Sequence, residues 1–279
     1  MELDNVLLIG GSGFVGGWIA SCLSERGIRV TIPTRRRENT KKLIMLPMVS
    51  MVEANVHDPQ VLAQLMQGQD AVINLVGVLH DTDSRLPYGR GFQAAHVDLP
   101  KKIIAAMCEN GVRRLVHMSA LRAGINAPSE YLRSKGDGEA AVRSAMNELD
   151  VTVFRPSVIF GPDDAFLNMF AKLLRLFPVL PLGGGSARFQ PVYVGDVARA
   201  FADSLTDGAT FGQTYELCGP KVYTLREMVD YTAHLVGKQR RIIDLGTGGW
   251  AYLQAGLMWL LPNPPLSPDN LRSMELDSV

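Results

Sequence analysis

The sequence has few cysteines and no net charge. Its three cysteines, Cys22, Cys108 and Cys218, are odd in number and far apart, which excludes a disulfide framework and a metal knuckle and predicts a reducing, cytoplasmic location. The 28 Lys and Arg residues balance the 28 Asp and Glu residues, so no overall field attracts nucleic acid or an anionic membrane. We therefore expect no nucleic-acid partner, and any anion site must be local.

A hydrophobic run long enough to span a membrane is also missing. The most apolar stretch, residues 250–261, is shorter than the roughly 20 residues of a spanning helix. It contains no Lys or Arg, so we expect a soluble protein that does not sediment with anionic liposomes. Packing into the protein core is favoured, and docking on a partner or on a membrane surface are the alternatives. Residues 1–5 lack the basic region of a signal peptide, so we expect folded structure from the start.

Short apolar runs alternate with helical patterns through the first half of the chain. Strands that are continuously apolar are covered on both faces, as in a parallel sheet with helices on either side. The sequence therefore predicts a doubly wound α/β fold. The expected strands are 6–10, 30–33, 49–53, 71–76, 115–118, 151–154, 190–194 and 214–217, and the expected helices are 14–26, 58–67, 98–110 and 136–149.

A glycine cluster joins the first predicted strand to the first predicted helix, with glycines at positions 10, 11, 13 and 16. Glycine lets the backbone turn sharply and approach a pyrophosphate closely, and the helix N-terminus adds free N–H groups and a partial positive charge. The order strand, glycines, helix therefore predicts a dinucleotide site. A turn without a ligand is the alternative.

The second predicted strand ends in basic residues where an NAD site has an acidic residue for the ribose hydroxyls. Arg35, Arg36 and Arg37 follow Thr34, and the first carboxylate is Glu38. An arginine can bind a 2′-phosphate through two N–H groups, so NADP(H) is favoured over NAD(H). The alternative is a solvated basic loop.

Tyr131 and Lys135 are four residues apart, so within a helix they share one face. Ser119 follows the predicted strand 115–118, at the carboxyl edge where α/β sheets bind ligands. A nearby ammonium lowers the pKa of a phenol from about 10, which makes a tyrosine a usable proton donor and acceptor. We predict that Ser119, Tyr131 and Lys135 are catalytic, with Ser119 holding the substrate oxygen.

These motifs together resemble one family. Three further motifs contribute to the resemblance: Asn-Leu-Val-Gly at 74–77, Arg-Pro-Ser-Val-Ile-Phe-Gly-Pro at 155–162 and Val-Gly-Asp-Val at 194–197. Over essentially the whole chain, the pattern is similar to the extended and atypical short-chain dehydrogenase/reductases, which are NAD-dependent epimerase/dehydratase-like proteins. Segments 131–139 and 215–226 are most similar to the branch that contains the nucleotide-binding accessory subunit of respiratory complex I and its bacterial relatives.

This resemblance implies a Rossmann fold, bound NADP(H), and Ser119, Tyr131 and Lys135 as the catalytic set. The chain departs from the family at Asn55, where an aspartate often contacts adenine, and at His96, where asparagine is common. The residues expected at the cofactor are Gly10, Gly13 and Gly16 on the pyrophosphate, Arg35 and Arg36 on the 2′-phosphate, Val56 near the adenine, Lys135 on the nicotinamide ribose, Pro156 and Val158 near the carboxamide, and also Phe14, Val15, Val76 and Gly77.

The expected organisation has two parts. Residues 1–157 form the dinucleotide-binding domain, with 190–219 added to its sheet. Residues 158–189 and 220–279 form a small, discontinuous substrate lobe, in which 267–279 are expected as a frayed tail. The ligand then lies between the two parts.

The sequence is consistent with two different functions. The leading hypothesis is an NADP(H)-dependent oxidoreductase or epimerase that acts by hydride transfer on the carbonyl or hydroxyl group of a small, lipid-like or isoprenoid molecule. The alternative is a non-catalytic accessory or redox-sensing protein that binds NADPH, is linked to the respiratory chain or quinone metabolism, and contacts the membrane periphery or a respiratory complex. Members of the similar branch bind NADPH without an established reaction, so the catalytic set does not guarantee turnover. No metal site is expected, because His57, His80, His117 and His234 lack ligand spacing with Cys, Asp or Glu.

Overall fold

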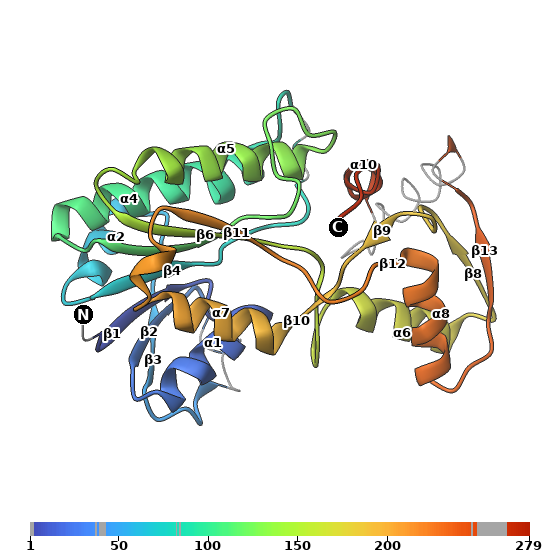
Figure 1. The fold of residues 1–279 in the computed structure, drawn as a ribbon, viewed down its shortest axis with the longest axis horizontal. Helices are drawn as coiled ribbons and strands as arrows, with labels where there is room; N and C mark the ends of the chain where they lie inside the picture. Colours follow the sequence, from blue (N-terminus) through green and yellow to red (C-terminus); the bar gives the residue numbers. More distant parts are fainter. Residues whose placement is uncertain are drawn as a thin grey trace.

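A seven-stranded sheet lies at the centre of the computed structural model, which describes residues 3–36, 38, 43–81, 83, 85–246, 248–249 and 267–279. Its order is β11-β6-β5-β4-β1-β2-β3, and its neighbouring strands are parallel. The direction of winding reverses between β1 and β4, which confirms the predicted doubly wound, Rossmann-like fold (Figure 1). The strands are β1 (Asn5–Ile9), β2 (Arg29–Thr34), β3 (Val49–Glu53), β4 (Ala71–Asn74), β5 (Arg114–Met118), β6 (Asp150–Pro156) and β11 (Gln213–Leu217).

Helices cover both faces of the sheet, because alternate side chains of each strand point to opposite faces. In β1, Leu8 packs in one apolar core with α1 and α7, and Leu7 packs in another with α2, α4 and α5. Both leucines are fully buried. Figure 1 shows the two layers on either side of the sheet. The helices are α1 (Phe14–Glu25), α2 (Pro59–Met66), α4 (Leu99–Asn110), α5 (Glu130–Ser144) and α7 (Val194–Ser204).

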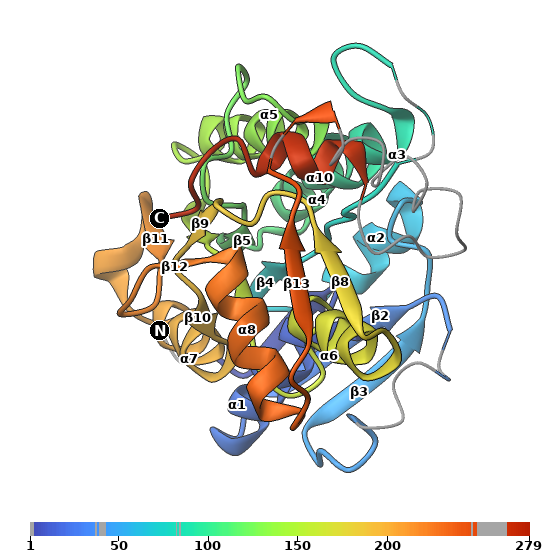
Figure 2. The same ribbon diagram turned by 90° about the vertical axis from the view of Figure 1, so that its right-hand side faces the viewer.

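A second group of elements, here called the small lobe, has an apolar core of its own, which includes Phe170, Leu180, Leu225 and Ile242. Helix α6 packs against α8, β8 pairs in parallel with β13, and β9 pairs antiparallel with β12. Figure 2 looks onto the end of this lobe. Its elements are α6 (Phe166–Leu176), β8 (Val179–Leu182), β9 (Arg188–Phe189), β12 (Tyr223–Thr224), α8 (Leu225–Leu235) and β13 (Arg241–Asp244).

The prediction that a strand over 190–194 joins the central sheet was wrong. Only the short β10 (Val192–Tyr193) forms there, and it pairs with β7 (Ile159–Phe160) outside that sheet. Pro191 has no N–H to give to a ladder, and the fully buried Val194 already opens α7. Of residues 190–219, therefore, β11 supplies the strand in the sheet, after a short 3₁₀ helix, η3 (Gly208–Thr210).

Three predicted boundaries also shift. Helix α5 begins at Glu130 rather than at 136, because the Ser129 hydroxyl accepts the Leu132 N–H at 3.2 Å and starts the helix earlier. Strand β4 ends at Asn74 rather than at 76, because the Asn74 side chain accepts the Val76 N–H at 3.2 Å and turns the chain. Helix α4 is preceded by further helical turns, α3 (Arg90–Phe92) and the π-helical η2 (Gln93–Asp98).

The end of the chain is folded rather than frayed. It contains α10 (Pro268–Ser273), and the Ser278 N–H donates to the Arg188 carbonyl at 2.8 Å beside β9. The Ser157 hydroxyl, just after β6, donates to the Ser278 carbonyl at 2.7 Å. The apolar segment 250–261 lies outside the described residues. Within the described ones, no helix has the length and apolar character needed to cross a membrane.

Candidate active site

The predicted site residues follow the carboxyl ends of parallel strands, so the sheet brings them to one edge beside the switch point. Tyr131 and Lys135 lie on α5, which follows β5 in the chain. The others are Gly10, Gly13, Phe14, Val15 and Gly16 after β1, Arg35 and Arg36 after β2, Val56 after β3, Val76 and Gly77 after β4, Ser119 after β5, and Pro156 and Val158 at the end of β6.

The glycine loop between β1 and α1 is shaped for close approach. Gly10 has a φ of +85°, which favours glycine. A Cβ on Gly16 would lie 2.5 Å from the Gly11 Cα, so the helix packs directly on the loop. Gly13 is the N-cap of α1 and offers no side-chain acceptor to the first N–H groups of that helix. The loop can therefore present these N–H groups to an anion.

Arg35 and Arg36 lie at the open end of the site. Both side chains are exposed, and the Thr34 hydroxyl oxygen accepts the Arg36 N–H at 3.3 Å, which shapes the turn after β2. Burial lowers the pKa of His57, and the nearby Lys102 and Arg35 lower it further. Arg35 thus lies near the turn after β3, which contains His57 and Val56.

Lys135 lies at the other, closed end. Its side chain is buried, and its Nζ donates to the Met118 carbonyl at 2.7 Å, one residue before Ser119. Burial lowers the pKa of Lys135 to about 8, against an opposing effect of Glu139 one turn further on. A Cβ on Gly77 would lie 3.8 Å from this Nζ. The ammonium therefore borders the ends of both β4 and β5.

The Ser119 side chain is 3% exposed, and its Oγ has no hydrogen-bond partner among the described residues. Buried hydroxyls are nearly always hydrogen-bonded in native proteins. An unpartnered Oγ directly after β5 is suited to a hydrogen bond with an oxygen atom of a ligand.

Tyr131 differs from the sequence-based expectation. Lys135 was expected to lower the pKa of this phenol, but burial raises that pKa to about 12. The physical reason is that the Lys135 ammonium is hydrogen-bonded to the Met118 carbonyl, while the Tyr131 ring packs among aromatic residues. Its ring meets the His96 ring edge-on, with 5.6 Å between centroids. The phenol is therefore held protonated at neutral pH.

His96 links the end of β4, η2 and α5. The Ser134 hydroxyl donates to the Tyr131 carbonyl at 2.8 Å, so its oxygen accepts from His96 Nδ1 at 2.8 Å. The other ring nitrogen, Nε2, accepts the Val78 N–H at 3.0 Å. Burial and the Lys135 charge lower the pKa of His96 to about 2. His96 is thus a neutral ring that joins three elements around the site, at the position where the similar family often has asparagine.

Two further groups were not found from the sequence. The Asp269 carboxylate of α10 accepts the N–H groups of Glu130 and Tyr131, at 2.8 and 3.0 Å, and so caps α5 from a distant segment. Glu139 makes a two-point ion pair with Arg155 of β6, with contacts of 2.9 and 2.6 Å. The Ser-Pro-Asp-Asn start of α10 is a helix-start signal in the sequence, but nothing local shows that it meets α5.

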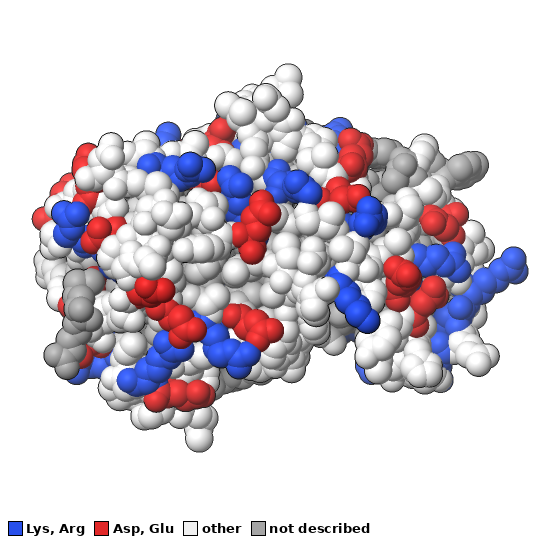
Figure 3. Space-filling model, in the orientation of Figure 1, with Lys and Arg blue, Asp and Glu red and all other residues white. Residues whose placement is uncertain are grey.

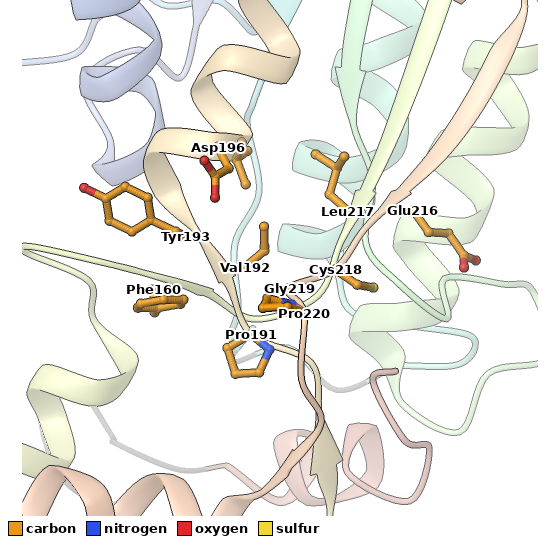
Figure 4. Close-up of a pocket in the computed structure, with 11 residues that line it drawn as sticks. Phe160, Pro191, Val192, Tyr193, Asp196, Glu216, Leu217, Cys218, Gly219 and Pro220 are labelled. Carbon is orange, nitrogen blue, oxygen red and sulfur yellow. The ribbon is translucent and has the colours of Figure 1, made fainter.

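A pocket of about 270 Å³ opens beside the carboxyl end of β11, next to β7, β10 and the start of α7 (Figure 4). Its lining residues include the aromatic Phe160 and Tyr193 and the acidic Asp196 and Glu216. These residues differ from the predicted site residues. Within the described residues, no group of three His, Cys, Asp or Glu side chains is arranged to hold a metal ion.

The seven-stranded parallel sheet with helices on both faces defines a protein of the Rossmann-like α/β class. More narrowly, the chain belongs to the NAD dependent epimerase/dehydratase family, whose model matches residues 6–218. Among solved structures it is similar in fold to DesIV, a dTDP-glucose 4,6-dehydratase from Streptomyces venezuelae with NAD and TYD bound. The TM-score is 0.76 at 22% identity, over 87% of this chain and 84% of that one.

Similar proteins come from two groups. Subunit 9 of the NADH dehydrogenase [ubiquinone] 1 alpha subcomplex from Arabidopsis thaliana mitochondria is 31% identical over 85% of this chain and 59% of its own length. The ceramide reductase of Caulobacter vibrioides is 27% identical, over 88% of this chain and 74% of its own length. An Escherichia coli O157:H7 4-epimerase, named for N-acetyl-alpha-D-glucosaminyl-diphospho-ditrans,octacis-undecaprenol, is 26% identical, over 81% and 70%. The chain thus spans less than two thirds of the mitochondrial relative.

Proposed function

We propose that this protein binds NADP(H) and reduces or epimerises a lipid-like carbonyl or hydroxyl compound. The observation that carries the proposal is the buried, unpartnered Ser119 Oγ, in the residue directly after Met118, whose carbonyl accepts from the buried Lys135 ammonium. A hydroxyl and an ammonium at the carboxyl edge of a doubly wound sheet can stabilise a substrate carbonyl or hydroxyl oxygen that becomes negatively charged during the reaction. The ceramide and undecaprenol named for two relatives support the lipid-like class of substrate.

The residues present fit a dinucleotide phosphate. The glycine loop leaves no room for side chains where a pyrophosphate would approach, since even a Cβ on Gly16 would meet the backbone. Arg35 and Arg36 are exposed cations at the end of β2, and they suit a 2′-phosphate. A Cβ on Gly77 would lie 3.8 Å from the Lys135 ammonium, so the lack of a side chain there leaves space beside Lys135 at the end of β4, on the side proposed for the nicotinamide ribose.

The bound nicotinamide would supply or accept the hydride. In the reducing direction, Ser119 Oγ would hold the carbonyl oxygen and Tyr131 would donate a proton to it. A phenol pKa of about 12 keeps Tyr131 protonated until the developing alkoxide takes that proton. Lys135, with a pKa of about 8, is mainly a cation near neutral pH, and its ammonium, held at the Met118 carbonyl, would contact the nicotinamide ribose rather than the phenol.

Cofactor choice is tested by titrating the purified protein with NADPH and with NADH. We expect NADPH to bind more tightly than NADH. Arg35→Asp should reduce or reverse this difference in affinity, because it removes a phosphate partner and adds a charge of the same sign as the phosphate. Arg29→Asp is the matched control, because Arg29 is an exposed residue at the opposite end of the same strand. Equal affinities of the unmodified protein for the two cofactors would contradict NADP(H) preference.

The proton donor is tested by oxidation of bound NADPH in the presence of lipid-like ketones. We expect Tyr131→Phe to lower the rate by about 100-fold or more while NADPH affinity changes by less than about twofold. Tyr223→Phe serves as the control, because Tyr223 is exposed on the small lobe. A Tyr131→Phe protein that keeps its full rate would assign the proton to another group.

A second function has its own support, the similarity to mitochondrial NADH dehydrogenase subunits. In that case NADPH would serve as a bound structural or redox-sensing ligand. Mass spectrometry of the denatured protein would then find NADPH at one molecule per chain. The same protein would oxidise none of it with any of the lipid-like ketones, and this result would favour the accessory role over the enzyme.

A further inference from the structure

Two segments about 60 residues apart meet at the outer end of the small lobe. They are residues 172–179, from the end of α6 into β8, and residues 235–241, from the end of α8 into β13. Together we call them the tip. Arg240 Nε donates to the Leu174 carbonyl at 2.8 Å, and the Arg241 N–H donates to the Pro178 carbonyl at 3.3 Å. Figure 2 looks onto this end and shows α6, α8, β8 and β13 grouped there.

The tip is basic and has no acidic residue. Lys172, Arg175, Lys238, Arg240 and Arg241 all lie in its two segments, which contain no Asp or Glu. Arg240 is half-buried against the end of α6, and the other four side chains are exposed. Five positive charges are therefore concentrated on one end of a protein whose formal net charge is zero.

The acidic residues of the same elements lie elsewhere on the lobe and have partners. Asp230 pairs with Arg226 at 3.5 Å, Glu227 closes the N-terminal cap of α8, and Asp244 accepts the Gly246 N–H at 2.8 Å. Over the larger body, both signs of charge are interspersed (Figure 3). The tip is thus a local exception to the mixed surface.

Large apolar side chains are exposed among these cations. Leu176 is 74% exposed, Phe177 51% and Leu235 66%. Leu176 and Phe177 directly follow Arg175, and Leu235 lies three residues before Lys238. A surface that combines exposed Leu and Phe with Lys and Arg is typical of segments that lie in the interface of an anionic membrane.

We propose that the tip docks on an anionic lipid surface. Leu176, Phe177 and Leu235 would enter the boundary between headgroups and acyl chains, and the cations would contact lipid phosphates. Charge complementarity selects this partner, because a second copy of the chain on a two-fold axis would bring like charges together. This proposal reverses the sequence-based expectation that the protein does not sediment with anionic liposomes, which depended on the absence of Lys and Arg from residues 250–261. The tip draws its cations from other segments, and this inference does not depend on the proposed function.

The test is flotation of the full chain with vesicles of phosphatidylcholine containing 30% phosphatidylglycerol or of phosphatidylcholine alone. We expect binding to the anionic vesicles only, and weakening by salt. Replacing Lys172, Arg175, Lys238 and Arg241 by Gln should weaken binding at least about 100-fold, at roughly fivefold for each charge. The pair Leu176→Ser and Phe177→Ser, which leaves every charge in place, should weaken it about tenfold.

The matched control replaces four exposed cations outside the tip, Arg29, Lys101, Arg113 and Lys221, by Gln. This control variant loses four positive charges, as the tip variant does, and it should bind anionic vesicles as tightly as the unmodified protein does. The proposal is overturned if the chain fails to float with anionic vesicles, if it floats equally with neutral ones, or if tip and control variants weaken alike. Tip-dependent binding of an RNA oligonucleotide without vesicle binding would also overturn it, and would assign the tip to nucleic acid. Circular dichroism verifies that each variant is folded.

Discussion

The two ends of the candidate site are built in different ways. The open end consists of the glycine loop and the turns after β2 and β3, where Arg35 and Arg36 are exposed. The closed end combines residues from the ends of β4 and β5 and from η2, α5 and α10. Lys135, His96 and Ser119 are all buried there. At the closed end, burial lowers the pKa of Lys135 to about 8 and that of His96 to about 2.

This difference separates binding from proton transfer. A charged phosphate can be held by backbone N–H groups and exposed arginines in the presence of water. A proton donor needs a dry site, in which burial moves pKa values and hydroxyls lack competing partners. Changes at the open end should therefore act on affinity, and changes at the closed end should act on pH dependence and turnover.

The largest effect is expected from Gly16→Ala at the open end. A Cβ there would lie 2.5 Å from the Gly11 Cα and 2.7 Å from the Gly10 carbonyl oxygen, so the loop has to move. We expect a loss of about 3 kcal/mol in the free energy of unfolding, measured by urea denaturation. NADPH affinity should fall by about 100-fold, since the pyrophosphate depends on this loop.

Gly17→Ala is the matched control on the same helix, because its Cβ would lie 3.6 Å from Leu43 Cδ2, an ordinary contact. It should leave NADPH affinity unchanged and raise the free energy of unfolding by up to about 1 kcal/mol, because alanine favours a helix. Equal losses of NADPH affinity in Gly16→Ala and Gly17→Ala would show that the close packing of α1 on the glycine loop does not decide NADPH binding.

The next effect concerns Lys135 and pH. Its pKa is about 8 in the folded protein and 10.5 when unperturbed, so between these values the unfolded state binds more protons. The free energy of unfolding should therefore rise with pH across this window. The rise is up to about 3 kcal/mol relative to Lys135→Met, which lacks the titrating group. Denaturation curves at several pH values measure the difference, and parallel pH profiles for the two proteins would refute the buried ammonium.

The smallest effect is expected from Asp269→Asn, which keeps the size of the side chain that caps α5 but removes its charge and replaces one of its two accepting oxygens by an NH2 group. We expect a loss of about 1 kcal/mol in the free energy of unfolding. Hydrogen exchange at the Glu130 and Tyr131 amides should be faster. Asp277→Asn is the control, since the Asp277 carboxylate also accepts a backbone N–H, from Arg188 at 3.1 Å, but away from α5. If the amides of 130 and 131 exchange alike in both variants, Asp269 does not hold the helix that carries Tyr131.

The open end was largely predictable from the sequence. The glycine loop is a local pattern between an apolar strand and a helix, and the structure has it in that place. The spacing of Tyr131 and Lys135 suits one helical face, although the predicted helix began only at 136 and the structure extends it back to Glu130. Both features depend on residues that are close in the chain, so their geometry follows from the period of the helix and the conformational freedom of glycine.

The surroundings of these residues were not predictable in the same way. The sequence suggested that Lys135 lowers the pKa of Tyr131, whereas the Lys135 ammonium is bonded to Met118 and burial raises that pKa. The residues 267–279 suggested a frayed tail, whereas Asp269 caps α5. Both outcomes depend on which distant atoms come into contact and on how much water they exclude.

The sequence by itself determined the doubly wound sheet, the glycine loop and the presence of a helix after β5, because these features arise from apolar periodicity and short spacings. Only the tertiary structure decided the chemistry of the closed end and the basic tip. Desolvation of Lys135 and His96 requires side chains from several strands and helices to surround them. The concentration of cations at the tip requires two segments about 60 residues apart to meet, and no local pattern in the chain specifies that meeting.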